Sequence, residues 1–165
     1  MTARAPGAVE PANVAAEPYR ILVVDDDPTQ LTFIQGVLGA AKLAVSAFQT
    51  SEEALAAVRA AREPFHVICA DYWMPQMDGL DLLHRIHELG DDASGVLITA
   101  ATDHIEAERR GRSEVICVLG KPFKPDELIS LVTRLARLTE LQRKARRIGE
   151  AAFALQSETQ RDHQA

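Results

Sequence analysis

The sequence predicts a doubly wound α/β fold built on a five-stranded parallel sheet. Short, almost wholly apolar segments recur along the chain, and such segments are typical of strands that are buried on both faces. Segments with the apolar spacing of amphipathic helices separate them, and a strict alternation of strand and helix indicates parallel pairing through right-handed crossovers. Several apolar segments end in acidic or loop-forming residues. We therefore expect polar groups at the carboxyl end of the sheet, where ligands bind in such folds.

The composition suits a single soluble domain with some chain to spare. The 165 residues are 47% hydrophobic and 25% charged, with a formal net charge of −6. This charge argues against a uniformly basic nucleic-acid binder, and no apolar segment approaches the ~20 residues that span a bilayer. The N-terminus has no apolar signal region, and Cys69 and Cys117 lack metal or redox spacing. We expect a cytoplasmic protein that binds neither nucleic acid nor membrane.

The first half of the chain is expected to hold a leader, three strands and three helices. Residues 1–18 are rich in Ala, Pro and Glu without periodicity, which is typical of a flexible leader. Helix starts are indicated by Asp27 before Pro28, by Thr50 with Glu53 three positions later, and by Asp78. The expected strands span 20–24, 43–48 and 66–71, and the expected helices span 28–39, 51–62 and 79–89.

The second half continues the alternation. Strands are expected at 96–100 and 115–119, with a short helix at 103–111 between them. Pro125 then opens a last, long helix, of which a domain of this fold needs only the part up to about Leu138. Five strands separated by helices fit the flavodoxin-like strand order 2-1-3-4-5.

Chemically reactive residues follow the predicted strands. They are Asp25, Asp26, Asp71, Thr99 and Lys121. Each alone is readily explained as a strand-end cap or a surface charge, but on this fold all would face one crevice. Three carboxylates in one crevice repel one another unless a hard cation neutralises them, and oxygen ligands favour Mg²⁺ or a similar divalent ion. A carboxylate nucleophile with a metal, a lysine and a hydroxyl predicts phosphoryl transfer to an aspartate.

Residues 20 to about 138 resemble the receiver domain of two-component response regulators, in its stand-alone, chemotaxis-regulator-like form. The motifs that carry the resemblance are I-L-V-V-D-D-D-P, D-Y-W-M-P-Q-M-D-G, V-L-I-T-A and G-K-P-F. Their order and spacing also suit the family. We therefore expect the domain to span residues 19–138.

The resemblance implies a role for each residue of the crevice. Asp71 would accept the phosphoryl group, Lys121 would bind a phosphoryl oxygen, and Thr99 would move to bond another. The Mg²⁺ ligands would be Asp25 (through a water), Asp26, Asp71 and the backbone carbonyl of Trp73. The phosphodonor would be a sensor histidine kinase or a phosphotransfer protein, and the output would be contact with a downstream protein. Such a chain is a switch and no enzyme beyond its own phosphorylation and dephosphorylation.

Two alternatives remain open from the sequence. Many family members carry an aromatic residue three positions before the lysine, where this chain has Val118. That departure mildly favours a pseudo-receiver that acts as a scaffold or dimerisation adaptor without phosphorylation. An aspartate-nucleophile hydrolase would normally place a second acid two residues after the nucleophile, and this chain has Trp73 there.

Residues 139–165 extend the last helix beyond the expected domain. An interrupted apolar stripe continues along it, made of Leu131, Leu135, Leu138, Ala145, Ile148, Ala152 and Leu155. We interpret this extension as dimerising, forming a homodimer, in preference to a frayed tail or a truncated linker. The basic residues 143–147 are interpreted as a solvated helix face.

Overall fold

The computed structural model describes residues 17–102, 105 and 114–162. A five-stranded sheet lies at its centre, with the strand order β2-β1-β3-β4-β5 and every neighbouring pair parallel. The strands are β1 (Arg20–Val24), β2 (Ala44–Phe48), β3 (Val67–Asp71), β4 (Ser94–Thr99) and β5 (Val115–Gly120). The predicted flavodoxin-like fold is therefore confirmed.

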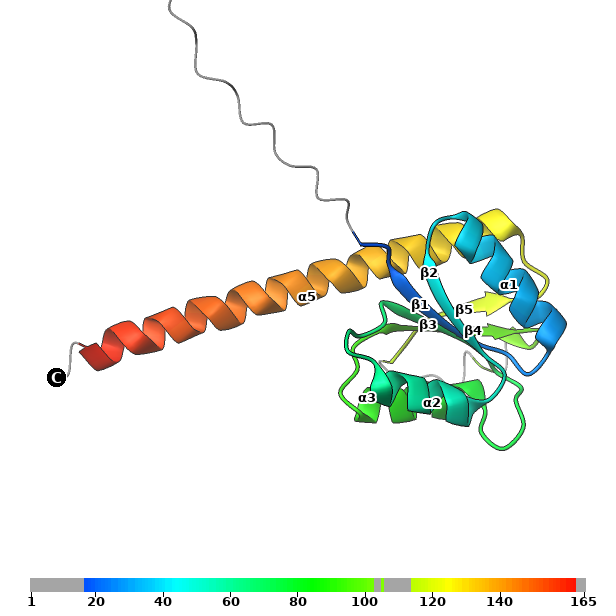
Figure 1. The fold of residues 1–165 in the computed structure, drawn as a ribbon, viewed down its shortest axis with the longest axis horizontal. Helices are drawn as coiled ribbons and strands as arrows, with labels where there is room; N and C mark the ends of the chain where they lie inside the picture. The colour runs from blue at the N-terminus through cyan, green and yellow to red at the C-terminus, as the bar shows by residue number, and fades with distance from the viewer. Residues whose placement is uncertain (1–16, 103–104, 106–113, 163–165) are drawn as a thin grey trace, which may run out of the picture.

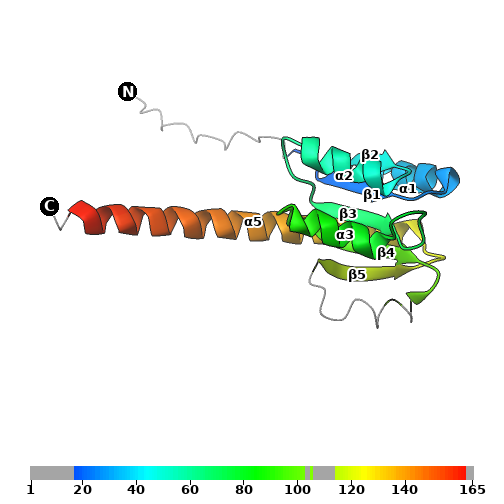
Figure 2. The ribbon, with the colours of Figure 1, turned by 90° about the horizontal axis from the view of Figure 1, so that it is seen from below.

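Helices cover both faces of the sheet (Figures 1 and 2). They are α1 (Pro28–Ala40), α2 (Ser51–Ala60), α3 (Gly79–Glu88) and α5 (Pro125–Asp162). The side chains of β1 alternate between the two layers: Ile21 and Val23 pack with α1 and α5, whereas Leu22 and Val24 pack with α2 and α3. The expected short helix at 103–111 lies outside the described residues except for Ile105, which is buried.

The predicted helix starts are confirmed by their caps. Asp27 accepts hydrogen bonds from the backbone N–H groups of Thr29 and Gln30, and Thr50 accepts one from the N–H of Glu53. Asp78 caps α3 in the same way. Position 79 also requires glycine, because a Cβ there would collide with the backbone carbonyl of Asp71.

The fourth strand begins two residues earlier than the sequence predicts. Ser94 and Gly95 pair with β3 in register, although neither belongs to the apolar pattern. The hydroxyl of Ser94 is buried against that of Thr139, and a Cβ at Gly95 would collide with the carbonyl of Glu114. Tertiary contacts therefore determine where β4 begins, and the hydrophobic pattern of the sequence does not reveal this start.

Helix α5 is 38 residues long and runs unbroken past the sheet. Its first part packs on the sheet through Leu128, Val132 and Ala136. Its later part projects from the amino end of the strands in both views (Figures 1 and 2). Among the described residues, no helix is both long and apolar enough to cross a lipid bilayer. The division of the chain at residues 18 and 138 stays a prediction.

Candidate functional site

The carboxyl ends of three strands bring an acid pair and a lysine into direct contact. Asp25 follows β1, Asp71 ends β3 and Lys121 follows β5. The Lys121 Nζ lies 2.7 Å from Asp71 Oδ1 and 3.3 Å from Asp25 Oδ2. The register aligns these strand ends, since Val24 pairs with Ala70. The sheet therefore assembles three charges that are far apart in the sequence.

Asp26 joins this cluster as a third acid. One carboxylate oxygen from each of Asp25, Asp26 and Asp71 lies within 4.8 Å of the others. Asp25 and Asp71 are only 2% and 7% exposed, whereas Asp26 is exposed. We call Asp25, Asp26, Asp71 and Lys121 the carboxyl-end pocket.

The electrostatics of the carboxyl-end pocket show that its negative charge is not fully compensated. Burial raises the pKa of Asp25, and the charge of Asp71 adds to this effect, while the backbone N–H of Asp27 and the ammonium of Lys121 oppose it. Burial lowers the pKa of Lys121, but the hydrogen bond to Asp71 and the nearby carboxylates outweigh burial and raise it overall. Three carboxylates against one ammonium leave an excess of two negative charges.

The donor set of the pocket fits a hard divalent cation. The three carboxylates converge within 4.8 Å, and Lys121 contacts only Asp25 and Asp71, so the pocket offers oxygen ligands with uncompensated charge. Mg²⁺ and similar ions take such ligands together with waters. These residues could therefore hold the divalent ion that the sequence led us to expect.

The structure places Thr99 at the end of β4, fully buried. Its hydroxyl accepts a hydrogen bond from the Ala101 N–H at 3.1 Å, and its carbonyl accepts one from the Lys121 N–H at 2.7 Å. Val118, three residues before the lysine, is partly buried against the core under α2 and α3. Trp73 lies just after β3, with its ring largely exposed and edge-on to Tyr72 at 4.8 Å between centroids.

An apolar hollow of about 480 Å³ adjoins Lys121 between α1 and the segment after β5. Phe33 of α1 lies there half exposed, with its ring centroid 6.4 Å from that of Phe123. Sequence reasoning missed Phe33, because it lies off the buried face of α1. Phe123 could have been found, since it ends the G-K-P-F motif.

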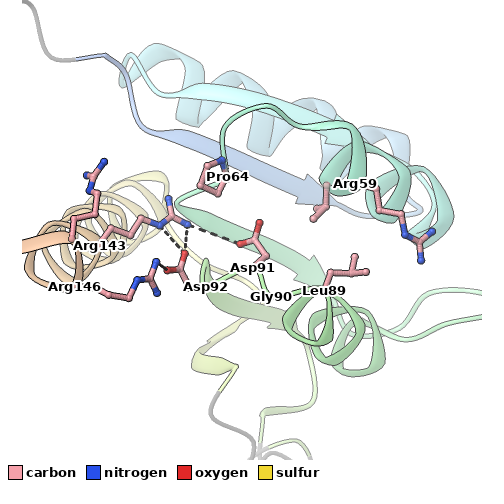
Figure 3. Close-up of a pocket in the computed structure, with 10 residues that line it drawn as sticks. Arg59, Pro64, Leu89, Gly90, Asp91, Asp92, Arg143 and Arg146 are labelled. Carbon is pink, nitrogen blue, oxygen red and sulfur yellow. Dashed lines mark hydrogen bonds and ion pairs between the residues drawn. The ribbon is translucent and has the colours of Figure 1, made fainter. Parts of the chain in front are cut away.

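A second charged cluster lies at the opposite, amino end of the sheet (Figure 3). Arg143 of α5 is only 8% exposed and donates to Asp92 at 2.7 Å and to the Phe65 carbonyl at 2.7 Å. Arg146 also binds Asp92, at 2.6 Å. The prediction that residues 143–147 form a solvated helix face is therefore wrong for Arg143, which is buried against the ends of β3 and β4.

Thr139 completes this second cluster one turn earlier on α5. Its hydroxyl lies 2.8 Å from the Ser94 hydroxyl and donates to the His66 carbonyl at 3.0 Å. We call Ser94, Asp92, Thr139, Arg143 and Arg146 the amino-end clasp. Burial raises the pKa of Asp92, but its bonds to the two arginines outweigh burial and hold that pKa below its usual value.

Comparison with known proteins agrees with this geometry. Residues 21–133 match the family model of the response regulator receiver domain. The chain is 33% identical over 128 residues to the DNA-binding transcriptional regulator NtrC of Salmonella typhimurium, which covers 78% of this chain and 27% of the regulator. It is 34% identical over 114 residues to an uncharacterised 14.6 kDa protein of Leptolyngbya boryana, covering 68% of this chain and 86% of that protein.

Solved structures show the same fold. The chemotaxis protein CheY4 of Vibrio cholerae superposes with a TM-score of 0.62 at 25% identity, covering 72% of this chain and 98% of that one. The chain spans only about a quarter of the length of the NtrC regulator, so the match concerns the receiver part alone. With the strand order, the acidic strand ends and the family match in agreement, the chain belongs to the response regulator receiver domain family.

Proposed function

We propose that this receiver domain accepts a phosphoryl group on Asp71 in a reaction that uses Mg²⁺. The donor is a phosphohistidine on a sensor histidine kinase or on a phosphotransfer protein. The observation that carries the proposal is the contact of Lys121 with both Asp71 and Asp25 in a pocket where three carboxylates converge. Receiver domains are signalling switches, so the product is a changed surface and no released metabolite.

The residues of the pocket supply what the transfer needs. Asp71 is the attacking group, and one of its oxygens forms the new bond to phosphorus as the bond to the donor nitrogen breaks. Lys121 already contacts Asp71 at 2.7 Å, so its ammonium is in place to stabilise charge on the phosphoryl oxygens. The Mg²⁺ ion, when bound, would neutralise the pocket and the developing charge.

Each metal ligand is proposed from its position. Asp26 and Asp71 would bind Mg²⁺ directly and Asp25 through a water, with the backbone carbonyl of Trp73 as a further ligand. The proximity of the three carboxylates supports Asp25, Asp26 and Asp71 as ligands. The position of Trp73, two residues after Asp71, supports its carbonyl as a further ligand.

Thr99 provides a route from phosphorylation to a surface change. An aspartyl phosphate places nearly two negative charges at the end of β3. The Thr99 hydroxyl, which now accepts from the Ala101 N–H, would turn to donate to a phosphoryl oxygen and draw the loop after β4 inward. Val118 has no aromatic ring and cannot act as an aromatic switch, so we propose that the readout in this chain begins at Thr99.

The apolar hollow beside Lys121 supports a docking place for the donor. Its exposed Phe33 and its neighbour Phe123 lie next to the pocket, where a protein that delivers phosphohistidine must approach. A rim of apolar contact near the reacting atoms would hold the donor during transfer. We propose this hollow as part of the kinase or phosphotransfer interface.

The pseudo-receiver alternative has less support. A scaffold would have no need of Asp26, Asp71, Thr99 and Lys121 together, whereas Val118 alone speaks for it. The reducing cytoplasm suits the two cysteines, which are unpaired in the structure. We therefore propose a cytoplasmic switch that signals by protein contact. The stand-alone organisation stays a prediction.

The test is incubation of the whole protein with Mg²⁺ and acetyl phosphate, followed by intact mass and peptide mapping. We expect a mass gain of one phosphoryl group that maps to Asp71 and does not appear when EDTA is present during the incubation. The Asp71→Asn variant should show no gain, while a matched Asp81→Asn variant on α3 should behave as the unaltered chain. No labelling of the unaltered chain would reject the proposal in favour of the pseudo-receiver, and equal labelling of Asp71→Asn would reject Asp71 as the acceptor.

A further inference from the structure

Helix α5 has two different faces beyond its packed first part. One face carries the amino-end clasp, through Thr139, Arg143 and Arg146, which bind residues at the starts of β3 and β4. The clasp fixes the direction in which the helix leaves the domain. From Lys144 to Ala154, every described side chain is exposed.

The other face carries an apolar stripe with alternating spacings of three and four residues. Its members among the described side chains are Leu138, Leu141, Ala145, Ile148 and Ala152. Ile148 is 71% exposed, and Leu138 and Leu141 are about half exposed. A repeat of 3.5 residues is the signature of a helix that packs lengthwise against another helix.

The stripe cannot reach the domain of its own chain. Arg143 and Ile148 are five positions apart, which places them about 140° apart around the helix axis. Because Arg143 is held against Asp92 and the Phe65 carbonyl, Ile148 faces away from the sheet. Packing through the clasp and packing through the stripe therefore use opposite sides of one helix and do not compete.

Beyond Arg146, every described side chain up to Ala154 is exposed, so this part of α5 gains little burial from its own chain. Residues 148–162 extend a helix that is already nucleated, and Gly149 lowers the helix propensity of this extension. The carboxyl-end pocket lies at the other end of the sheet and does not contact this segment. A second helix along the stripe would supply the missing burial.

A second copy of this chain fits the stripe. The positions that flank the repeat between Leu138 and Ala152 are Gln142, Lys144, Gly149 and Ala151. Only Lys144 is charged, so two identical stripes meet without like-charge repulsion. In such a pair each clasp faces outward, so the two receiver domains lie on opposite sides of the helix pair and do not collide.

We propose that α5 from Leu138 onward pairs with α5 of a second copy of this chain as a two-stranded coiled coil, through the stripe named above. The interface is separate from the carboxyl-end pocket. Its failure in a test therefore leaves the proposed phosphorylation untouched, and the reverse also holds.

Sedimentation velocity over a concentration series of the full chain tests this proposal. We expect a species of twice the 18.0 kDa chain mass, and Ile148→Ser should weaken the dimer at least about tenfold in Kd. The matched control is Phe153→Ser, because Phe153 is 73% exposed but lies off the stripe. This control should leave Kd unchanged. All three proteins should show the same urea unfolding of the receiver domain, which shows that the substitutions leave the domain folded.

Gly149→Ala gives an effect of opposite sign. A Cβ at Gly149 meets open space, so alanine should only favour the helix and tighten the dimer roughly three- to fivefold. A chain that stays monomeric up to about 100 μM overturns the proposal. So does a dimer that Ile148→Ser leaves unchanged, or one that Phe153→Ser weakens as much as Ile148→Ser does.

Discussion

The two ends of the sheet use the same kinds of side chain for opposite purposes. At the carboxyl end, three carboxylates converge and one lysine contacts two of them, Asp25 and Asp71, so negative charge is in surplus. At the amino end, Asp92 is shared by Arg143 and Arg146, Asp91 lies 4.0 Å from Arg143, and Arg143 also donates to a backbone carbonyl. The first cluster carries surplus negative charge, whereas in the second two acids face two arginines.

This difference distinguishes a ligand-binding site from a cluster that stabilises the packing of two elements. Buried charges without full compensation cost stability, so such a cluster persists where a ligand completes it. A buried charge that is paired and hydrogen-bonded to neighbouring elements holds those elements together instead. Burial and perturbed pKa values occur at both ends, and only the balance of charge distinguishes them.

The largest expected effect comes from removing the cation of the carboxyl-end pocket. Lys121→Met leaves Asp25 and Asp71 facing each other and removes the ammonium aimed at the phosphoryl group. We expect the rate of phosphorylation by acetyl phosphate to fall by about 10²-fold or more. Lys124→Met, on the exposed side of the same loop, is the control and should keep the rate. A rate in Lys121→Met equal to that of the control would contradict the role of Lys121.

The second effect comes from removing the cation of the amino-end clasp. Arg143→Met leaves Asp92 with one arginine and the Phe65 carbonyl without its donor. The free energy of unfolding should fall by about 2 kcal/mol, measured by urea denaturation. Arg147→Met, an exposed arginine one turn later, should change it by less than about 0.5 kcal/mol. Phosphorylation at Asp71 should continue in both variants. Loss of phosphorylation in Arg143→Met alone would show that the two ends are coupled.

The smallest effect is a pH dependence at the amino end. Burial lowers the pKa of His66, with the charge of Arg143 acting in the same direction, while Glu140 opposes both. Its Nδ1 accepts the Arg20 N–H at 3.0 Å, so the folded chain favours the neutral ring. Stability should therefore fall as pH drops below the unfolded value of about 6.5 towards the lower folded pKa.

The His66→Asn variant checks this pH dependence. Asparagine keeps an acceptor for Arg20 but does not titrate, so the slope of stability against pH between about 7 and 5 should flatten. His87→Asn, on the exposed face of α3, should keep the slope of the unaltered chain. Equal slopes in all three proteins would remove His66 as the cause.

The sequence predicted the fold and the carboxyl-end pocket because their signals are local. Each strand is an apolar segment, and each site residue follows such a segment directly, so Asp25, Asp71 and Lys121 could be placed once parallel pairing was assumed. The sequence could not predict that Lys121 contacts both acids, because Asp25 lies 96 residues and Asp71 lies 50 residues before it.

The amino-end clasp escaped prediction for a physical reason. Arg143 meets Asp92 and Phe65 across 51 and 78 residues, and nothing near it in the sequence marks it as buried. Ser94 likewise begins β4 as a polar residue because its partner is Thr139, 45 positions away. A charged residue on an otherwise polar helix is solvated in most cases, and only the course of α5 past the sheet makes this one an exception.

Titration with Mg²⁺, followed by the fluorescence of Trp73, tests most directly whether the carboxyl end is incomplete and the amino end complete. Trp73 is the only tryptophan of the chain and lies two residues after Asp71. We predict one saturable change in the unaltered protein and in Arg143→Met, and none in Asp26→Asn. No change in the unaltered protein, or the same change in Asp26→Asn, would contradict the account.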